Sequence, residues 1–414
     1  MIKPRPLLRL CALALLLLLP ACASWRPAPA GTPERMVLLI SVDGFRADYL
    51  DRGLTPNMKA LADRGVRGVM RPAFPSKTFP NHYTLVTGLR PDRHGLVDNV
   101  MRDPLLPGRT FRLGDRAEVT DPVWWEEGEP LWVTAERAGM QTAVLFWPGS
   151  EAPVRGVQPS LWMAFDQSMT AEARADQMLA WLDGAGQAKP GLLALYFDEV
   201  DTYGHWHGPD SGELDAALER TDAAIGRLME GLAARGLLAR TDIVVVADHG
   251  MAPTSRARTI DLDALVSRED GEVLTSGVHL AFQPAPERRR EVEAALLRAH
   301  DHMECWRKGE MPDRFAYGRH RRVPEIFCLA EPGWEILPRA LAEARPQAGG
   351  AHGYDPAHPT MAAVFIAAGP RIAPGVALPR FDNVDVYPFL TGLLGLGPAD
   401  HDGNPATLRA VLKP

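Results

Sequence analysis

The sequence predicts an α/β protein whose central sheet is mostly parallel, is covered by helices on both faces and carries a small inserted cap. Short, continuously apolar runs are typical of buried parallel strands, and they occur at residues 37–42, 142–146, 192–197, 243–246 and 362–366. Helical patterns lie between them, most clearly at 171–182 and 214–234, and a shorter helix is expected at 56–64, ending at Gly65. Strands that alternate with helices in this way build a parallel sheet with helices on both sides.

The N-terminal segment is expected to lie outside the fold. Basic residues precede an apolar stretch that is too short to span a bilayer, so residues 1–22 are predicted to be an export signal. The letters LPAC, ending at Cys22, resemble a lipoprotein box with an unusual Pro20, and they also fit an ordinary cleavage site between small residues. Residues 23–35 are rich in Pro and Ala and are predicted to be a tether. We therefore expect an exported, periplasmic protein that contacts a membrane only if Cys22 is lipidated.

The remaining chain, residues 36–414, is predicted to be one domain with an insertion. Lys and Arg number 45 against 52 Asp and Glu, a net charge of −7 without a basic run, which excludes a nucleic-acid-coating surface. The strand–helix alternation breaks at about 256–340, where we expect a strand at 278–282, a charged helix at 287–300 and then an irregular Pro- and Arg-rich stretch. A last helix at 384–394 is expected to close the domain.

Two cysteines follow the predicted signal and tether, and both lie in the insertion. An oxidising compartment makes a disulfide between Cys305 and Cys328 plausible, and two unpaired cysteines fit the sequence equally well. Neither cysteine lies in a pattern typical of metal ligands.

Acidic residues and histidines gather where the predicted strands meet one edge of the sheet. They are Asp43 after the first strand, Asp201 and His205 after the run at 192–197, Asp248 and His249 after the run at 243–246, and His352 before the last strand. The carboxyl ends of parallel strands line one crevice, so these side chains are expected to converge. Oxygen and imidazole donors in this mixture suit a pair of Zn²⁺ ions. Each residue alone is more often a helix cap or an ordinary histidine, but capping does not explain so many together.

Thr78 is the candidate nucleophile. In the segment RPAFPSKTFPNHYTLVTG, Pro80 suits the first turn of a helix, which places Thr78 at the helix N-terminus, where free amides favour an anion. A hydroxyl beside a zinc ion becomes an alkoxide nucleophile. The alternative interpretation is an N-cap threonine, which is the commoner role of such a residue.

These segments together resemble the nucleotide pyrophosphatase/phosphodiesterase family of the alkaline phosphatase superfamily. The resemblance runs in order from about residue 36 to 370 through SVDGFRADYL, PSKTFPNHYTLVTGLRPDRHGLVDN, EPLWVTAERAG with FWPGS, DEVDTYGHWHGPDS, VVVADHGM, and GAHGYDP with MAAVFIAAGP. It implies an alkaline phosphatase-like fold. Because the chain is too short for the extra domains of mammalian members, it is expected to be a minimal bacterial catalytic unit.

The resemblance also assigns roles to individual residues. It implies one zinc held by Asp43, Thr78, Asp248 and His249, and a second held by Asp201, His205 and His352. Thr78 would attack phosphorus to give a phosphothreonyl intermediate, and Asn99 would donate to a non-bridging phosphate oxygen, with help from the backbone N–H of Phe79. Phe79, Phe165 and Tyr196, with Leu113 nearby, would form a nucleotide-base slot, although nucleotide-cleaving members more usually have Tyr where this chain has Phe165.

The expected activity is cleavage of a small-molecule phosphodiester or pyrophosphate bond with release of a nucleoside 5′-monophosphate. A choline-type phospholipid or glycerophosphodiester is the alternative substrate, since an aromatic cage also holds a quaternary ammonium by cation–π attraction. Phosphonate hydrolysis is a minor option, whereas a phosphomonoesterase and a sulfatase are disfavoured. From another class, a non-catalytic binding protein on the same fold is disfavoured because the metal-site residues are all present.

Overall fold

A computed structural model describes residues 35–184 and 189–413 of the chain. The predicted signal at 1–22, including Cys22, and residues 23–34 of the predicted tether lie outside the described residues. Among the residues that are described, no helix is long and apolar enough to cross a membrane.

An eight-stranded sheet forms the centre of the molecule. Its strands run in the order β18 (Phe381–Asp382), β2 (Val66–Arg71), β17 (Ala363–Ala368), β8 (Thr241–Val246), β1 (Met36–Val42), β7 (Leu192–Phe197), β5 (Thr142–Leu145) and β6 (Leu161–Met163). Every residue of β1, β7, β8 and β17 is buried, which explains why the sequences of these strands are mostly apolar. The α/β class and the mostly parallel sheet are therefore confirmed.

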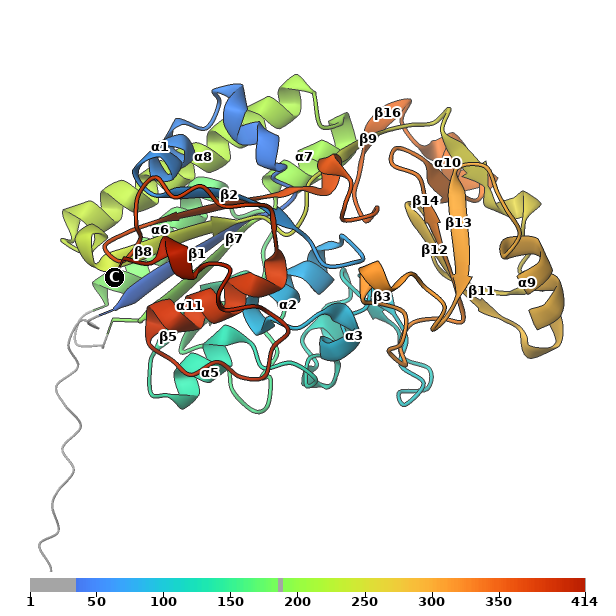
Figure 1. Cartoon of the computed structure of the whole chain (residues 1–414), viewed down its shortest axis with the longest axis horizontal. Helices are drawn as coiled ribbons and strands as arrows, with labels where there is room; N and C mark the ends of the chain where they lie inside the picture. The colour runs from blue at the N-terminus through green and yellow to red at the C-terminus, as the bar shows by residue number, and fades with distance from the viewer. Residues whose placement is uncertain (1–34, 185–188, 414) are drawn as a thin grey trace, which may run out of the picture.

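Helices cover both faces of the sheet (Figure 1). One layer contains α1 (Pro56–Arg64), α6 (Ala171–Asp183), α7 (Glu199–His207) and α8 (Gly212–Ala234). The other contains α2 (Thr78–Thr87), α3 (Pro91–His94), α5 (Leu131–Arg137) and α11 (Val386–Leu394), with the short α4 (Arg116–Val119) in the connection before α5. Helix α1 begins at a proline and is followed by Gly65, as predicted.

Strand β17 is the exception to the parallel order, because it runs antiparallel to both β2 and β8. An antiparallel strand buried on both faces has the same apolar run as a parallel one, so composition does not reveal its direction. This reversal matters for the site. His352 precedes β17, and a strand that runs the opposite way begins at the edge where its neighbours end.

The predicted insertion leaves the sheet between β8 and β17 through a two-stranded stem. The stem pairs β9 (Ala252–Ser255) with β16 (Ala348–Ala351), and the residues between them, 256–347, are called the inserted region below. That region stands beside the main body, beyond the stem (Figure 1). It contains the pair β10 (Thr259–Asp261) and β15 (Glu335–Leu337), the helices α9 (Arg289–Leu296) and α10 (Arg339–Ala344), and a four-stranded antiparallel sheet of β11 (Gly271–Thr275), β12 (His279–Pro284), β14 (Ile326–Ala330) and β13 (Met303–Arg307).

The inserted region is more ordered than its sequence predicts. The expected irregular stretch contains β13 and β14, and the expected helix at 287–300 shortens to α9 after a 3₁₀ turn. Cys305 and Cys328 lie directly opposite each other in these two strands and form a disulfide, with 3.9 Å between their Cα atoms. The disulfide therefore joins neighbouring strands of the inserted sheet, and the reading with two unpaired cysteines is wrong.

Candidate active site

Asp43, Asp248 and His249 form one group of potential metal ligands at the carboxyl edge of the sheet. Asp43 directly follows β1, and Asp248 and His249 follow the adjacent β8, so the parallel pairing of these strands brings them together. Their ligand atoms lie within 4.8 Å of one another. His249 Nε2 lies 2.8 Å from Asp248 Oδ2 and 3.5 Å from Asp43 Oδ1. The backbone N–H of Gly44 donates to Asp248 Oδ1 and orients that carboxylate.

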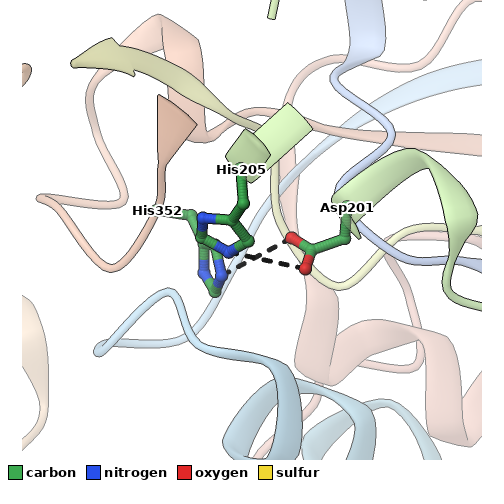
Figure 2. Close-up of side chains that lie close together, drawn as sticks. All are labelled: Asp201, His205 and His352. Carbon is green, nitrogen blue, oxygen red and sulfur yellow. Dashed lines mark ion pairs between the residues drawn. The ribbon is translucent and has the colours of Figure 1, made fainter. Parts of the chain in front are cut away.

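Asp201, His205 and His352 form a second such group, shown in Figure 2. Asp201 and His205 are four residues apart on α7 and therefore share one face of the helix. Asp201 Oδ2 lies 3.5 Å from His205 Nε2, and Asp201 Oδ1 lies 3.5 Å from His352 Nε2. The rings of His249 and His352 stack with 3.5 Å between centroids, so the two groups are adjacent.

The three histidines are held in the tautomer that a metal requires. In each case Nδ1 lies within hydrogen-bond distance of a backbone carbonyl, an acceptor only, so Nδ1 is the protonated nitrogen. The pairs are His205 with Gly350 at 2.8 Å, His249 with Gly250 at 2.9 Å and His352 with Ser76 at 2.8 Å. Each Nε2 of a neutral ring consequently presents a lone pair to the site.

The two groups bring the carboxylates of Asp43, Asp201 and Asp248 close together. Asp43 Oδ1 and Asp201 Oδ1 are buried and have no hydrogen-bond partner among the described residues, and buried Asp248 Oδ2 lies 2.8 Å from the His249 ring nitrogen. The pKa of Asp43 is raised well above its usual range, mainly by burial and in addition by repulsion from the Asp248 and Asp201 carboxylates. Buried oxygens without partners are unfavourable unless a cation binds there. The donor set therefore fits two metal ions.

Thr78 is the first residue of α2, as predicted, but it is not the N-cap. Lys77 occupies that position, and no side chain caps the helix, so the interpretation of Thr78 as an N-cap threonine is wrong. Thr78 Oγ1 lies 3.5 Å from His249 Nε2, beside the first group of ligands. The hydroxyl thus faces the site with no capping bond to break.

Asn99 lies next to the start of α2. Its Oδ1 accepts a 3.0 Å hydrogen bond from the backbone N–H of Phe79, which fixes the orientation of the amide and leaves the NH₂ group as a donor. The Phe79 N–H therefore positions Asn99 in this structure, and its expected help in binding phosphate stays a prediction.

A cavity of about 440 Å³ opens beside these groups. Its walls include all four predicted pocket residues, Phe79, Leu113, Phe165 and Tyr196, together with Thr78, Asp43 and Asp201. Phe165 is 41% exposed and lies edge-on to Phe146 at 5.3 Å. Tyr196 is buried, and its hydroxyl donates to Asp43 Oδ2 at 2.6 Å. This residue therefore orients the carboxylate of Asp43, a potential metal ligand, and also lines the cavity.

The polar wall of the cavity is a feature that sequence reasoning missed. Glu151 forms an ion pair with Arg116 at 2.6 Å, and Asp198 forms one with Arg174 at 2.7 Å. Gln167 donates to the other oxygen of Asp198. These residues come from separate loops and from helices α4 and α6, and no spacing in the sequence links them.

His82, one turn after Thr78 in α2, was also missed. Its Nδ1 donates to the Thr78 carbonyl at 2.9 Å, and its Nε2 lies 2.8 Å from Ser41 Oγ. Burial lowers the pKa of His82, so the ring is neutral. Its position four residues after Thr78 in FPNHYT is the only signal that pointed to it.

Comparisons with known proteins agree with this geometry. Residues 37–355 match the family model described as type I phosphodiesterase/nucleotide pyrophosphatase. The chain is 36% identical to an uncharacterised pyrophosphatase/phosphodiesterase of Schizosaccharomyces pombe, over 89% of this chain and 79% of that protein. It is 34% identical to ectonucleotide pyrophosphatase/phosphodiesterase family member 3 of Bos taurus over 93% of this chain but 45% of the relative, so it spans about half the length of that protein.

A solved structure is similar over nearly the whole described chain. It is an inactive threonine-to-alanine variant of murine ectonucleotide pyrophosphatase/phosphodiesterase 5 in complex with AMP. The TM-score is 0.86 at 32% identity, over 92% of this chain and 100% of the murine chain. The fold is therefore shared with a protein that has been solved in complex with AMP.

Proposed function

Since the chain belongs to the type I phosphodiesterase/nucleotide pyrophosphatase family, we propose that it is a two-zinc phosphodiesterase that cleaves nucleotide phosphodiester or pyrophosphate bonds and releases a nucleoside 5′-monophosphate. The observation that carries the proposal is the pair of adjacent ligand groups, whose buried oxygens Asp43 Oδ1 and Asp201 Oδ1 have no partner in the described chain, next to a helix N-terminus that presents Thr78. The AMP bound to the murine relative supports a nucleotide substrate.

In this proposal the ligands divide as the geometry groups them. One zinc would be held by Asp43, Thr78, Asp248 and His249, and the other by Asp201, His205 and His352. Bound zinc lowers the pKa of a hydroxyl or water and neutralises charge on phosphate oxygens. Imidazole and carboxylate donors are typical zinc ligands.

The residues of the chain then supply attack, charge stabilisation and substrate orientation. Thr78 Oγ forms a bond to phosphorus while the bond to the leaving oxygen breaks, which gives a phosphothreonyl ester. Water then hydrolyses this ester, releasing the nucleoside 5′-monophosphate and restoring the Thr78 hydroxyl. The Asn99 NH₂ group, oriented by Phe79 N–H, donates to a non-bridging oxygen throughout. Phe79 and Phe165 offer ring faces to the base, a contact worth about 1–3 kcal/mol per stacked base.

The decisive test compares a chromogenic diester, nitrophenyl thymidine 5′-monophosphate, with the monoester nitrophenyl phosphate. We expect a strong preference for the diester that disappears with a chelator and returns with zinc. Thr78→Ala should abolish turnover while the protein stays folded and retains zinc, whereas Thr78→Ser keeps a hydroxyl and should retain part of the activity. Near-wild-type turnover by Thr78→Ala, or preference for the monoester, would refute the assignment.

A choline-type phospholipid remains the competing substrate, and the polar wall argues against it. Binding a quaternary ammonium calls for uncompensated negative charge or an open aromatic cage. The carboxylates Glu151 and Asp198 are instead paired with arginines. Faster cleavage of lysophosphatidylcholine than of ATP or a dinucleotide would reverse this preference.

We further propose that the protein is exported to the periplasm. The support is the signal-like composition of residues 1–22, with Cys22 as the site of a lipid anchor. Fractionation of cells that express the wild type or Cys22→Ala tests the anchor. Release of the wild type into the soluble fraction after mild lysis would exclude it.

A further inference from the structure

The loop that carries Asn99 is fastened from the side of the inserted region. We define the Asn99 loop as residues 95–99. Arg322 Nη1 donates to the Gly95 carbonyl at 2.9 Å, and the Tyr317 hydroxyl donates to the Val97 carbonyl at 3.1 Å. Both donors are buried and belong to the inserted region. The loop is therefore built into the contact between that region and the main body.

Asp98 is the strongest of these attachment points. Its Oδ2 accepts hydrogen bonds from His279 Nε2 at 2.7 Å and from Thr275 Oγ1 at 3.1 Å, while its Oδ1 accepts the Asn99 backbone N–H at 2.7 Å. Asp98 is 4% exposed and His279 is fully buried. Burial raises the pKa of Asp98, but the attraction and hydrogen bond of His279, together with Lys77 and the Asn99 backbone N–H, outweigh it and lower the pKa overall. A buried charged carboxylate thus depends on a histidine of strand β12.

These bonds form a continuous connection from the inserted sheet to the nucleophile. His279 holds Asp98, Asp98 holds the backbone of Asn99, and the Asn99 side chain is fixed by Phe79, the neighbour of Thr78. A hydrogen bond to a charged group contributes more than one between neutral groups, and removing the donor leaves the charged partner buried without it. A donor displaced by about 1 Å can slow a reaction about a hundredfold.

We propose that the inserted region positions Asn99, with His279 acting through Asp98 as the principal positioning residue. This inference rests on the proposed function, because it needs Asn99 to contact the reacting phosphate. His279 itself touches neither substrate nor metal ligands in this scheme. It holds the donor loop at the distance and orientation that the transition state requires.

The test is a double-mutant cycle on nitrophenyl thymidine 5′-monophosphate, using the full zinc-loaded protein. We expect His279→Ala to lower kcat by about 10- to 100-fold with KM changed less than about twofold, since the lost contact acts on transition-state stabilisation. In the Asn99→Ala background the same substitution should have almost no further effect. His279→Gln keeps a side-chain N–H donor and should recover most of the activity. Zinc content and thermal unfolding, measured for every variant, report folding separately.

Two further variants sharpen the result. His302→Ala removes a partly exposed histidine of the inserted region that pairs with Glu331, and it should leave kcat unchanged. Tyr317→Phe removes only the hydrogen bond to the Val97 carbonyl, and it takes the place of His279→Ala in the double-mutant cycle if His279→Ala does not fold.

An equal loss of kcat from His279→Ala in the wild type and in Asn99→Ala, or no loss in either, would overturn the inference alone. A wild-type rate in Asn99→Ala would overturn it together with the role of Asn99, and a wild type without diesterase activity would overturn the proposed function itself.

Discussion

Replacing Asp43 with asparagine should stabilise the metal-free protein while it destroys the metal site. Asp43 Oδ1 is buried, has no hydrogen-bond partner in the described chain and faces Asp248, whereas Oδ2 accepts the Tyr196 hydroxyl. In Asp43→Asn, the amide oxygen can still accept from Tyr196. The amide NH₂ then points toward Asp248 and replaces a repulsion by an attraction.

The size of the effect follows from removing one partnerless buried charge. Satisfying such a group is worth about 1–3 kcal/mol. Unfolding entropy of about 2.1 cal/mol/K per residue, applied to a chain of this length, converts that energy to a rise in Tm of roughly 1–4 °C. With zinc present the wild type should have the higher Tm, because zinc binding stabilises the wild type more than the variant.

The effect should also depend on pH with a definite sign. The pKa of Asp43 is raised in the folded protein, so the folded state binds more protons than the unfolded state above the ordinary aspartate pKa. Stability of the metal-free wild type therefore falls as pH rises through this range, and the advantage of Asp43→Asn should grow from pH 4 to pH 8.

Differential scanning calorimetry of chelator-treated protein at several pH values measures these shifts. Asp242→Asn is the matched control, because Asp242 is equally buried but forms an ion pair with Arg371 at 2.5 Å. That substitution should destabilise the metal-free protein, because it removes the charge that pairs with Arg371. A metal-free Asp43→Asn protein that is less stable than the wild type at pH 8 would refute the reasoning.

Three other predictions follow from the same structure. Tyr196→Phe keeps the ring but removes the hydrogen bond to Asp43, so zinc affinity, measured by competition with a chromogenic chelator, should fall about 10- to 100-fold, and unchanged affinity would contradict the positioning role. Replacing Cys305 and Cys328 together by serine should lower the free energy of unfolding by about 3 kcal/mol, because the disulfide spans 23 residues, and insensitivity of Tm to reductant would contradict this. Burial raises the pKa of Glu127, but hydrogen bonds from neighbouring histidine and arginine side chains outweigh it and lower the pKa to about 2. Glu127→Gln should therefore destabilise the protein at pH 7, and the difference should shrink as pH falls from about 4.5 toward 2, whereas a constant difference would argue against the pairing.

The sequence allowed the central strands to be predicted because burial on both faces leaves an uninterrupted apolar run. Strands β1, β7 and β8 follow that rule. Strand β6 was missed because it has three residues at an edge and none is fully buried. Strand β13 was missed because exposed Glu and Arg side chains interrupt its apolar pattern.

Within the site, the ligand groups were predictable and the bonds that orient them were not. Each ligand follows or precedes a recognisable strand, and topology gathers them at one edge. The partners of the histidines are backbone carbonyls, which any residue provides. The contact between Asp98 and His279 joins positions 181 residues apart, and neither residue lies in a pattern that indicates the other.

The reversed direction of β17 has a consequence for how this protein can vary. The chain leaves the sheet after β8 and re-enters it at β17 through the same edge, so the detour between them begins and ends at neighbouring points. A segment whose ends lie so close together can become longer or shorter, or be exchanged, without a change in the order of the strands. His249 and His352 lie at the two ends of this segment, one in each ligand group. Ions bound to the two groups would therefore hold its two ends next to each other. Grafting a different segment between these two histidines is therefore a natural route to new substrate preferences on an unchanged catalytic edge, provided that the graft supplies its own anchor for the Asn99 loop.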